Sequence, residues 1–300
     1  MSPLSPSVSS GAAGFGQGAS SSMPDGPNAA SGFLTGQPAA WLATATLARR
    51  ELVRFVRQRN RVLGAVGQPI LFWLLFGAGL GASFQAPSWA GGMSYREYFF
   101  PGVLVLIVLF TAIFSTISII EDRREGFLQS VLVAPIPRWS IVAGKVAGGT
   151  LLAVGEALLF LALCPFAGIS ISLVKFGLLV LVLFPVAFGL TALGFTIAWR
   201  MDSTQGFHAI MNLFLMPLWL LSGAFFPASG VPGWLAVVIA VNPLTYGLAA
   251  MRRILYWEKA LPVEGEGLPG MAIALTVTLT FALTMFLAAI AVVSRRRHEG

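Results

Sequence analysis

The sequence has few charged residues and hardly any residues that bind metals. Only 10% of its 300 residues are charged and 56% are hydrophobic, whereas about 25% of the residues of a soluble protein carry a charge. Such a chain cannot cover a water-facing surface with polar groups, which excludes a soluble enzyme. A single cysteine excludes an intrachain disulfide, and with only two histidines a histidine metal site is not expected.

Motifs for nucleotide binding and hydrolysis are also missing from the sequence. Gly144 and Lys145 are followed by Val146, so the chain has no phosphate-binding loop of its own. It has no Gly-x-Ser-x-Gly turn, no His-Glu-x-x-His motif and no pair of carboxylates within an apolar run. A membrane-embedded enzyme is therefore poorly supported, and we expect no catalytic residue, metal or cofactor on this chain.

The sequence predicts an all-α integral membrane protein with six transmembrane helices. Each of six apolar runs has about the 20 residues that a helix needs to cross a bilayer. These runs are residues 62–84, 98–120, 146–168, 174–198, 207–226 and 270–293. Arginines cluster before the first run and after the last, which places both termini in the cytoplasm and requires an even number of crossings. With six spans, fourteen of the nineteen basic residues lie on the cytoplasmic side.

The segment after the fifth run, residues 227–251, is predicted to be a re-entrant or interfacial element on the outer side. Its apolar part, residues 231–241, is too short to cross a bilayer. Joining that part to residues 244–251 would give a seventh span, which contradicts the even number of crossings.

The N-terminal region divides into two parts. Residues 1–40 are rich in Ser, Gly, Ala and Pro, with Asp25 as the only charged residue, and this composition predicts a disordered tail. Residues 41–61 carry apolar residues and arginines at helical spacing, which predicts a basic amphipathic helix on an anionic membrane surface. Two roles stay open for this helix: a membrane anchor, or an element that couples the chain to a partner.

The connection between the second and third runs, residues 121–138, combines charge with a short apolar helix. Its charged lead-in consists of Glu121, Asp122, Arg123, Arg124, Glu125 and Gly126. The helix that follows places Phe127, Leu128, Val131 and Leu132 on one face. Such a helix can dock in a groove of a partner protein or rest on lipid headgroups, and both interpretations stay open.

Three short strings stand in order along this six-span frame. The first is Glu-Gly-Phe-Leu-x-x-x-Leu-x-x-Pro-x-x-Arg at 125–138, followed by Gly144 and Lys145. The second is Leu-Ser-Gly-Ala-Phe-Phe-Pro at 221–227, and the third is Asn-Pro-Leu-Thr-Tyr at 242–246. Together they resemble the permease subunits of ABC-2 type exporters, and the daunorubicin-resistance-like branch in particular. The resemblance covers about residues 41–298.

The resemblance implies an ABC-2 exporter fold (type V, ABCG-like) for residues 62–300. Residues 41–61 are similar to the connector helix of that family, and residues 121–138 to the coupling helix that contacts the ATP-binding subunit. Residues 227–251 are similar to its re-entrant outer helices. Similar permeases work as dimers with two ATP-binding subunits, so ATP and Mg would bind to the partner. The second permease would be another copy of this chain or a sister permease.

Small polar residues form a stripe along the second and the fifth predicted spans. Polar groups in lipid need hydrogen-bond partners or water, so each stripe indicates either helix–helix hydrogen bonds or the wall of a pathway. The resemblance favours the pathway, because similar exporters line their central cavity with these two spans. The candidates are Phe110, Thr111, Phe114, Ser115, Ser118, Asn212, Trp219 and Ser222. His208 shares the stripe of the fifth span, and we expect it to be structural.

Glu156 is a carboxylate that the sequence places near the middle of the third span. An ionised carboxylate at that depth is costly unless it is paired. A hydrogen bond across a helix contact is the favoured interpretation, and contact with cargo or protons is the alternative. Lys145 and Lys175 lie near span ends, and we expect them to extend to the interface.

The sequence is thus interpreted as the permease subunit of an ATP-driven exporter that works by alternating access in the bacterial inner membrane. Its aromatic, aliphatic and small polar pathway residues suit a drug-like or lipid-like amphipathic cargo, as in multidrug efflux. The alternatives are a polysaccharide or glycolipid exporter and, with less support, a stand-alone secondary transporter. The expected partners are ATP-binding subunits, a second permease and membrane lipid, and nucleic acid is not among them.

Overall fold

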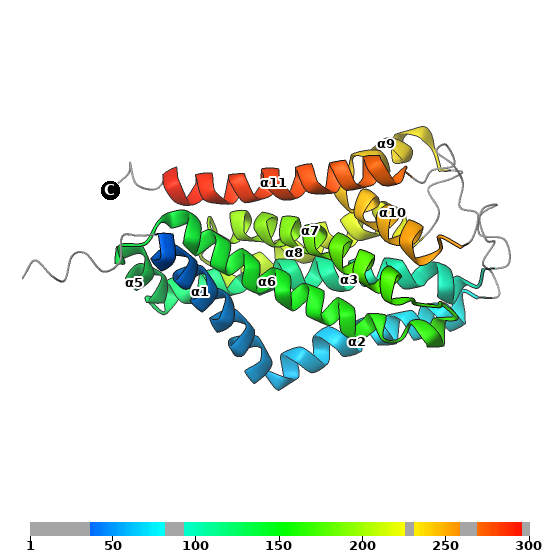
Figure 1. Cartoon of the computed structure of the whole chain (residues 1–300), viewed down its shortest axis with the longest axis horizontal. Coiled ribbons are helices and arrows are strands. Elements are labelled where there is room, and N and C mark those ends of the chain that lie inside the picture. The colour runs from blue at the N-terminus through cyan, green and yellow to red at the C-terminus, as the bar shows by residue number, and fades with distance from the viewer. Residues whose placement is uncertain (1–36, 82–92, 226–230, 259–268, 296–300) are drawn as a thin grey trace, which may run out of the picture. The chain divides into compact units, whose positions relative to one another are not determined.

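The computed structural model describes residues 37–81, 93–225, 231–258 and 269–295, which form helices joined by short connections (Figure 1). The α-helices are α1 (Gln37–Arg57), α2 (Arg59–Gly79), α3 (Tyr95–Ser115), α4 (Ile117–Arg124), α5 (Phe127–Val133), α6 (Arg138–Leu161), α7 (Leu173–Ala198), α8 (Thr204–Trp219), α9 (Gly233–Val241), α10 (Pro243–Leu255) and α11 (Met271–Arg295). The described residues also include a 3-10 helix, η2 (Cys164–Ala167), and a π-helical turn, η3 (Leu220–Ala224), and they include no strand. The all-α prediction is confirmed. The predicted tail lies outside the described residues, apart from residues 37–40 in the first turn of α1.

Five helical segments are long and apolar enough to cross a bilayer. They are Tyr95–Arg124, Arg138–Leu161, Leu173–Ala198, Thr204–Ala224 and Met271–Arg295. These segments match the second to sixth predicted spans, but their ends differ. The third span was expected at 146–168, whereas α6 begins directly after the extended residue Pro137 and ends at Leu161. Proline favours a helix start, since it lacks an N–H and the first helical turn needs none.

The first predicted span and the segment predicted to be re-entrant are shorter elements. The first span corresponds to α2, which contains Pro69 and whose apolar part is only Gly67–Gly79. Helices α9 and α10 meet at Asn242 with a bend of 80°. The described chain therefore has five candidate spans, or six if the bent pair is counted as one.

Helix α3 forms the centre of the bundle and packs against α2, α6, α7, α8 and α10. Its sequence is apolar on all sides, and such a helix is buried. The side chains of Tyr98, Phe99, Phe100 and Leu104 are fully buried there. Helices α8 and α11, in contrast, are less than half buried. Their exposed apolar faces are available to lipid or to another subunit.

Helix α1 lies along the start of α6 and meets α2 at an angle (Figure 1). The close approach depends on two glycines of α6, because a Cβ at Gly144 or Gly148 would lie within 2.8 Å of a side chain of α1. One face of α1, at Leu47, Ala48 and Glu51, is buried against the rest of the protein. Trp41, Leu42 and Val56 on its other faces are exposed, so contact of this helix with the membrane surface stays a prediction.

The start of α1, the end of α11 and the short helix α5 lie at the same side of the bundle (Figure 1). The hydroxyl of Thr44 donates to the carbonyl of Ser140 at 3.3 Å, and Arg138 donates to the carbonyl of Val293 at 2.8 Å. We call this side the α5 end and the opposite side, where α9 and α10 lie, the far end.

Candidate functional site

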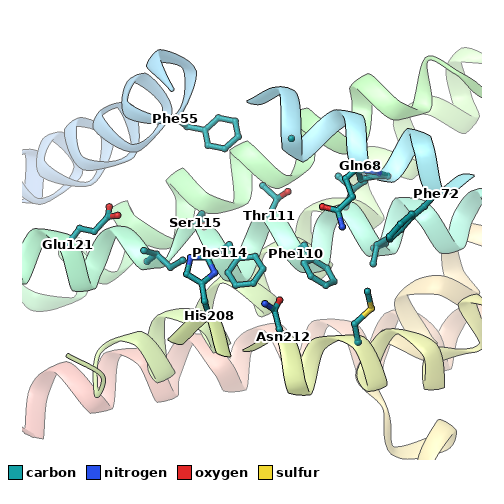
Figure 2. A pocket seen from close by; sticks show the side chains of 16 residues that line it. Phe55, Gln68, Phe72, Phe110, Thr111, Phe114, Ser115, Glu121, His208 and Asn212 are labelled. Atoms are coloured by element: carbon teal, nitrogen blue, oxygen red, sulfur yellow. The ribbon is translucent and has the colours of Figure 1, made fainter. Parts of the chain in front are cut away.

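A cavity of about 640 Å³ lies between α2, α3 and α8 and extends to α1 and α4 (Figure 2). Its wall combines aromatic and aliphatic side chains with small polar ones. The lining residues are Phe55, Gly64, Gln68, Pro69, Phe72, Leu106, Ile107, Phe110, Thr111, Phe114, Ser115, Ile117, Glu121, His208, Asn212 and Met216. Such a mixture suits a ligand with a large apolar body and few polar groups.

Five of the eight predicted pathway residues line this cavity: Phe110, Thr111, Phe114, Ser115 and Asn212. His208, which we expected to be structural, also lines it, and its ring lies 4.8 Å from that of Phe114 (Figure 2). Gln68 and Phe72 of α2 complete the wall, and the stripe analysis did not identify them because it treated spans two and five alone.

Ser118, Trp219 and Ser222 do not line the cavity. Ser118 is buried one turn further along α3–α4 and accepts a hydrogen bond from Lys145 at 3.3 Å. The Trp219 indole donates to the carbonyl of Gly102 at 2.8 Å, and the Ser222 hydroxyl donates to the carbonyl of Trp219 at 2.6 Å. The predicted stripe continues along α8, but the cavity ends at Met216. Ser118 and Trp219 form hydrogen bonds between helices instead, and Ser222 forms one within its own helical segment.

Glu156 lies behind the cavity wall. It is 5% exposed, and its carboxylate accepts a hydrogen bond from the Thr111 hydroxyl. Thr111 itself lines the cavity. The contact links α6 to α3, as the favoured interpretation expected, and one side chain separates the carboxylate from the cavity.

An ionic cluster at the α5 end joins α1, α4 and α6. Asp122 is fully buried at its centre, where its two oxygens accept from Arg50 at 2.8 and 2.9 Å. The ammonium of Lys145 contacts Asp122 and lies 2.6 Å from Glu51. The hydrogen bonds to Asp122 raise the pKa of Arg50 further above its usual value.

This cluster corrects the expectation for Lys145. Its side chain does not extend to the interface but is buried between two carboxylates. Lys175 is likewise buried and lies 3.0 Å from Glu258. A signal for the first pairing was present in the sequence, because Glu51 is the only acidic residue among the arginines of residues 41–61.

The cavity and the ionic cluster share a wall. Glu121 lines the cavity and accepts a hydrogen bond from Arg54 at 2.8 Å. Arg54 also donates to Asp122 at 3.1 Å. The hydrogen bonds of Arg54 therefore connect α1 to α4 at the end of the cavity.

The elbow, residues 121–138, has the predicted apolar face on α5. Leu128 is buried and Phe127, Val131 and Leu132 are half-buried, so the apolar face of α5 turns towards the protein. The guanidinium of Arg50 lies 3.8 Å from the centre of the Phe127 ring. Asp122 is buried in the cluster, and Arg123 binds Asp202 at 2.9 Å. The exposed residues of the elbow are Arg124, Glu125, Gln129, Ser130, Val133, Pro135 and Pro137.

Acidic, histidine and cysteine side chains do not gather into a metal site in the part of the chain that the structure describes.

Gly126 directly precedes α5 and has a φ of 76°, a conformation that favours glycine. Within the described residues, the arrangement contains a cavity, a charge cluster and a partly exposed elbow.

Comparisons with known proteins identify relatives of this chain. A family model described as ABC-2 type transporter matches residues 43–256. A transport permease of Cyanophora paradoxa is 29% identical over 212 residues, which cover 69% of this chain and 71% of the relative. An Escherichia coli protein named as a multidrug ABC transporter permease is 26% identical over 65% of this chain and 53% of its own length. A daunorubicin resistance permease of Streptomyces coeruleorubidus is 24% identical over 79% of this chain and 85% of the relative.

The matched residues run from α1 to α10 and include the cavity, the ionic cluster and the elbow. The apolar helices make the chain a multi-pass membrane protein. The relatives that it matches are transport permeases. The chain belongs to the ABC-2 type transporter family.

Proposed function

We propose that this permease exports a drug-like or lipid-like amphipathic cargo and is powered by a separate ATP-binding subunit. The observation that carries the proposal is the shared wall at Glu121, which joins a cavity of about 640 Å³ to the elbow through the ionic cluster. A transporter that has no nucleotide site of its own needs such a connection between its cargo site and its partner.

The partner would contact the exposed side of the elbow. Arg124, Glu125 and Gln129 are exposed there, and Val133 is 86% exposed. This surface presents both signs of charge around an apolar residue, which suits a groove on a soluble protein. The α5 end would then be cytoplasmic, and the membrane would be the bacterial inner membrane, as for an Escherichia coli relative named as an inner membrane transport permease.

Transport would proceed by alternating access within a dimer of permeases. Nucleotide binding would draw the two partner subunits together and move the elbows, and the cluster would pass this motion to α1 and α6. Binding energy can shift a conformational equilibrium only if the ligand binds the two states unequally. ATP and Mg would supply that difference on the partner.

The composition of the cavity wall supports an amphipathic cargo over a phosphorylated glycan. None of the lining side chains that the structure describes belongs to Lys or Arg, which are the charged side chains that commonly bind phosphate groups. The names of two relatives, multidrug and daunorubicin resistance, agree with this cargo class.

The experiment is reconstitution of the permease in liposomes with and without its ATP-binding subunit. We expect the two proteins to copurify and an amphipathic dye to move only when the subunit, ATP and Mg are all present. Transport by the permease alone would contradict the proposal and favour a secondary transporter.

A further inference from the structure

A junction of α3, α10 and the π-helical turn η3 lies beyond the far end of the cavity. Gly223 of η3 has a φ of 80°. Its carbonyl accepts a hydrogen bond from the Tyr98 hydroxyl of α3 at 3.2 Å and another from Arg252 of α10 at 2.8 Å. One backbone oxygen therefore connects three elements that are distant in the sequence.

The same junction holds the two cavity helices together. The cavity wall ends at Leu106 on α3 and Met216 on α8. About one turn further along, the Trp219 indole of α8 donates to the carbonyl of Gly102 on α3 at 2.8 Å. A Cβ at Gly102 would lie 2.6 Å from the carbonyl oxygen of Ala224, so the two backbones touch there. The junction thus stands between the cavity and the far side.

Arg252 is the unusual member of the junction. It is 4% exposed, and its guanidinium lies 4.4 Å from the centre of the Tyr98 ring. Within the described residues it forms no ion pair, and its buried Nε has no hydrogen-bond acceptor. A buried cation is costly unless it is paired and hydrogen-bonded, and ionisable residues inside membrane proteins mark functional positions.

The partners of Arg252 suit a contact that opens and closes. The carbonyl of Gly223 lies where α8 and η3 end, and the end of a helix carries a partial negative charge that attracts a cation. A carbonyl holds arginine less strongly than a carboxylate does. The contact is therefore specific in position but weaker than the ion pairs at the α5 end.

We propose that Arg252 is a positioning residue of the outer gate. It holds α3 and α8 together through the Gly223 carbonyl, and release of this contact opens the cavity to the far side. The proposal rests on the proposed function, because it assigns one of the two openings that alternating access requires. Arg252 touches neither cargo nor nucleotide in this assignment.

The test measures how readily the cavity is reached from the far side. An Asn212→Cys variant places a thiol in the cavity, and the native Cys164 is fully buried and gives little background. A membrane-impermeant thiol reagent is applied to the far-end side of proteoliposomes without ATP-binding subunit or nucleotide. We expect slow labelling in this parent and about tenfold faster labelling when Arg252→Met is added.

Two variants control for structural damage. Arg253→Met removes an equal charge from the same helix, where Arg253 donates to the carbonyl of Pro269, and it should leave labelling unchanged. Arg252→Lys keeps the positive charge but has fewer hydrogen-bond donors. It should label more slowly than Arg252→Met and faster than the parent. Equal labelling rates for the Arg252→Met and Arg253→Met variants would overturn the proposal.

If Arg252→Met does not yield a folded protein, the Tyr98→Phe variant tests the same junction by the same labelling measurement. This variant removes one of the two hydrogen bonds to Gly223 and keeps the ring beneath the guanidinium. We expect a twofold to fivefold rise in labelling, and an unchanged rate would overturn the proposal. The labelling experiment needs neither cargo nor ATP. A failure of ATP-driven transport would therefore refute the proposed function without changing the labelling result for the Arg252 contact.

Discussion

At the scale of single residues, the buried carboxylate of Asp122 is the centre of the ionic cluster. It is fully buried and contacts Arg50, Arg54 and Lys145. Removal of one partner from a buried ion pair leaves an uncompensated charge and costs about 3–5 kcal/mol. We expect Asp122→Asn to lower the free energy of unfolding by about that amount, measured by denaturant titration in detergent micelles.

Asp202 offers a matched control for this loss of charge. It pairs with Arg123 at 2.9 Å, but 86% of its side chain is exposed. Because exposed ion pairs contribute only about 0–1 kcal/mol, Asp202→Asn should have little effect on stability. Equal losses for the two variants would contradict the central role of Asp122. Adding Lys145→Met to Asp122→Asn should cost less than the sum of the single changes, since the two residues share one network.

At the scale of elements, the contact between α1 and α6 depends on Gly144. A Cβ at this position would lie 2.7 Å from Leu47 Cβ and 2.9 Å from the carbonyl oxygen of Thr44, so α1 would have to move away. Overpacking of this kind costs about 1–3 kcal/mol. We expect Gly144→Ala to lower stability by that amount and to reduce the cargo moved per ATP, since α1 carries the arginines of the cluster.

Gly155 on the same helix is the control for the added methyl group. No atom lies within 4 Å of the position of its Cβ, and alanine favours a helix over glycine by about 1 kcal/mol. Gly155→Ala should therefore be neutral or stabilising and should leave the ratio of transport to ATP hydrolysis unchanged. Equal losses of stability and transport in both glycine variants would show that α6 tolerates no added methyl group. This result would contradict a specific role for the contact between Gly144 and α1.

The sequence predicts five of the six spans because apolar length largely decides which segments can cross a bilayer, but it does not fix the helix ends or the short apolar part of α2. Helical periodicity also places Thr111 and Ser115 on the correct face of α3. Periodicity does not reveal depth along a helix, and Trp219 shares a face with Asn212 but lies beyond the end of the cavity. The pairing of Lys145 with Glu51 joins residues 94 positions apart, so the isolated acidic residue among the arginines indicates a buried partner but does not identify it.

At the scale of the whole molecule, the two ends of the bundle are held by different chemistry. The α5 end is held by buried ion pairs around Asp122. At the far end, hydrogen bonds to the carbonyl of Gly223 join α3, α10 and η3, and the ion pair between Lys175 and Glu258 has an exposed carboxylate. The cavity lies between them. An exporter that opens outwards requires strong contacts at the end that contacts the ATP-binding subunit. It requires weaker contacts at the end where the cargo would leave.

A second copy of the chain would complete the cavity along α8. Leu213 and Phe214 of this helix are 70% and 62% exposed, although their neighbour Asn212 lines the cavity. Helix α11 is also exposed, with Leu279 at 56%, but none of its residues lines the cavity. We therefore expect Leu213→Cys to form a disulfide-linked dimer under mild oxidation in native membranes.

Leu279→Cys is the matched control for this cross-link, because it is a leucine of similar exposure on α11, which we expect to face lipid. It should stay monomeric under the same oxidation, and the buried thiol of Cys164 should not contribute in either variant. Gel electrophoresis without reducing agent measures the dimer fraction. A cross-link at Leu279→Cys and none at Leu213→Cys would move the subunit interface to α11. The cavity would then open to lipid rather than to a partner permease, and the pathway would have to be formed within a single chain.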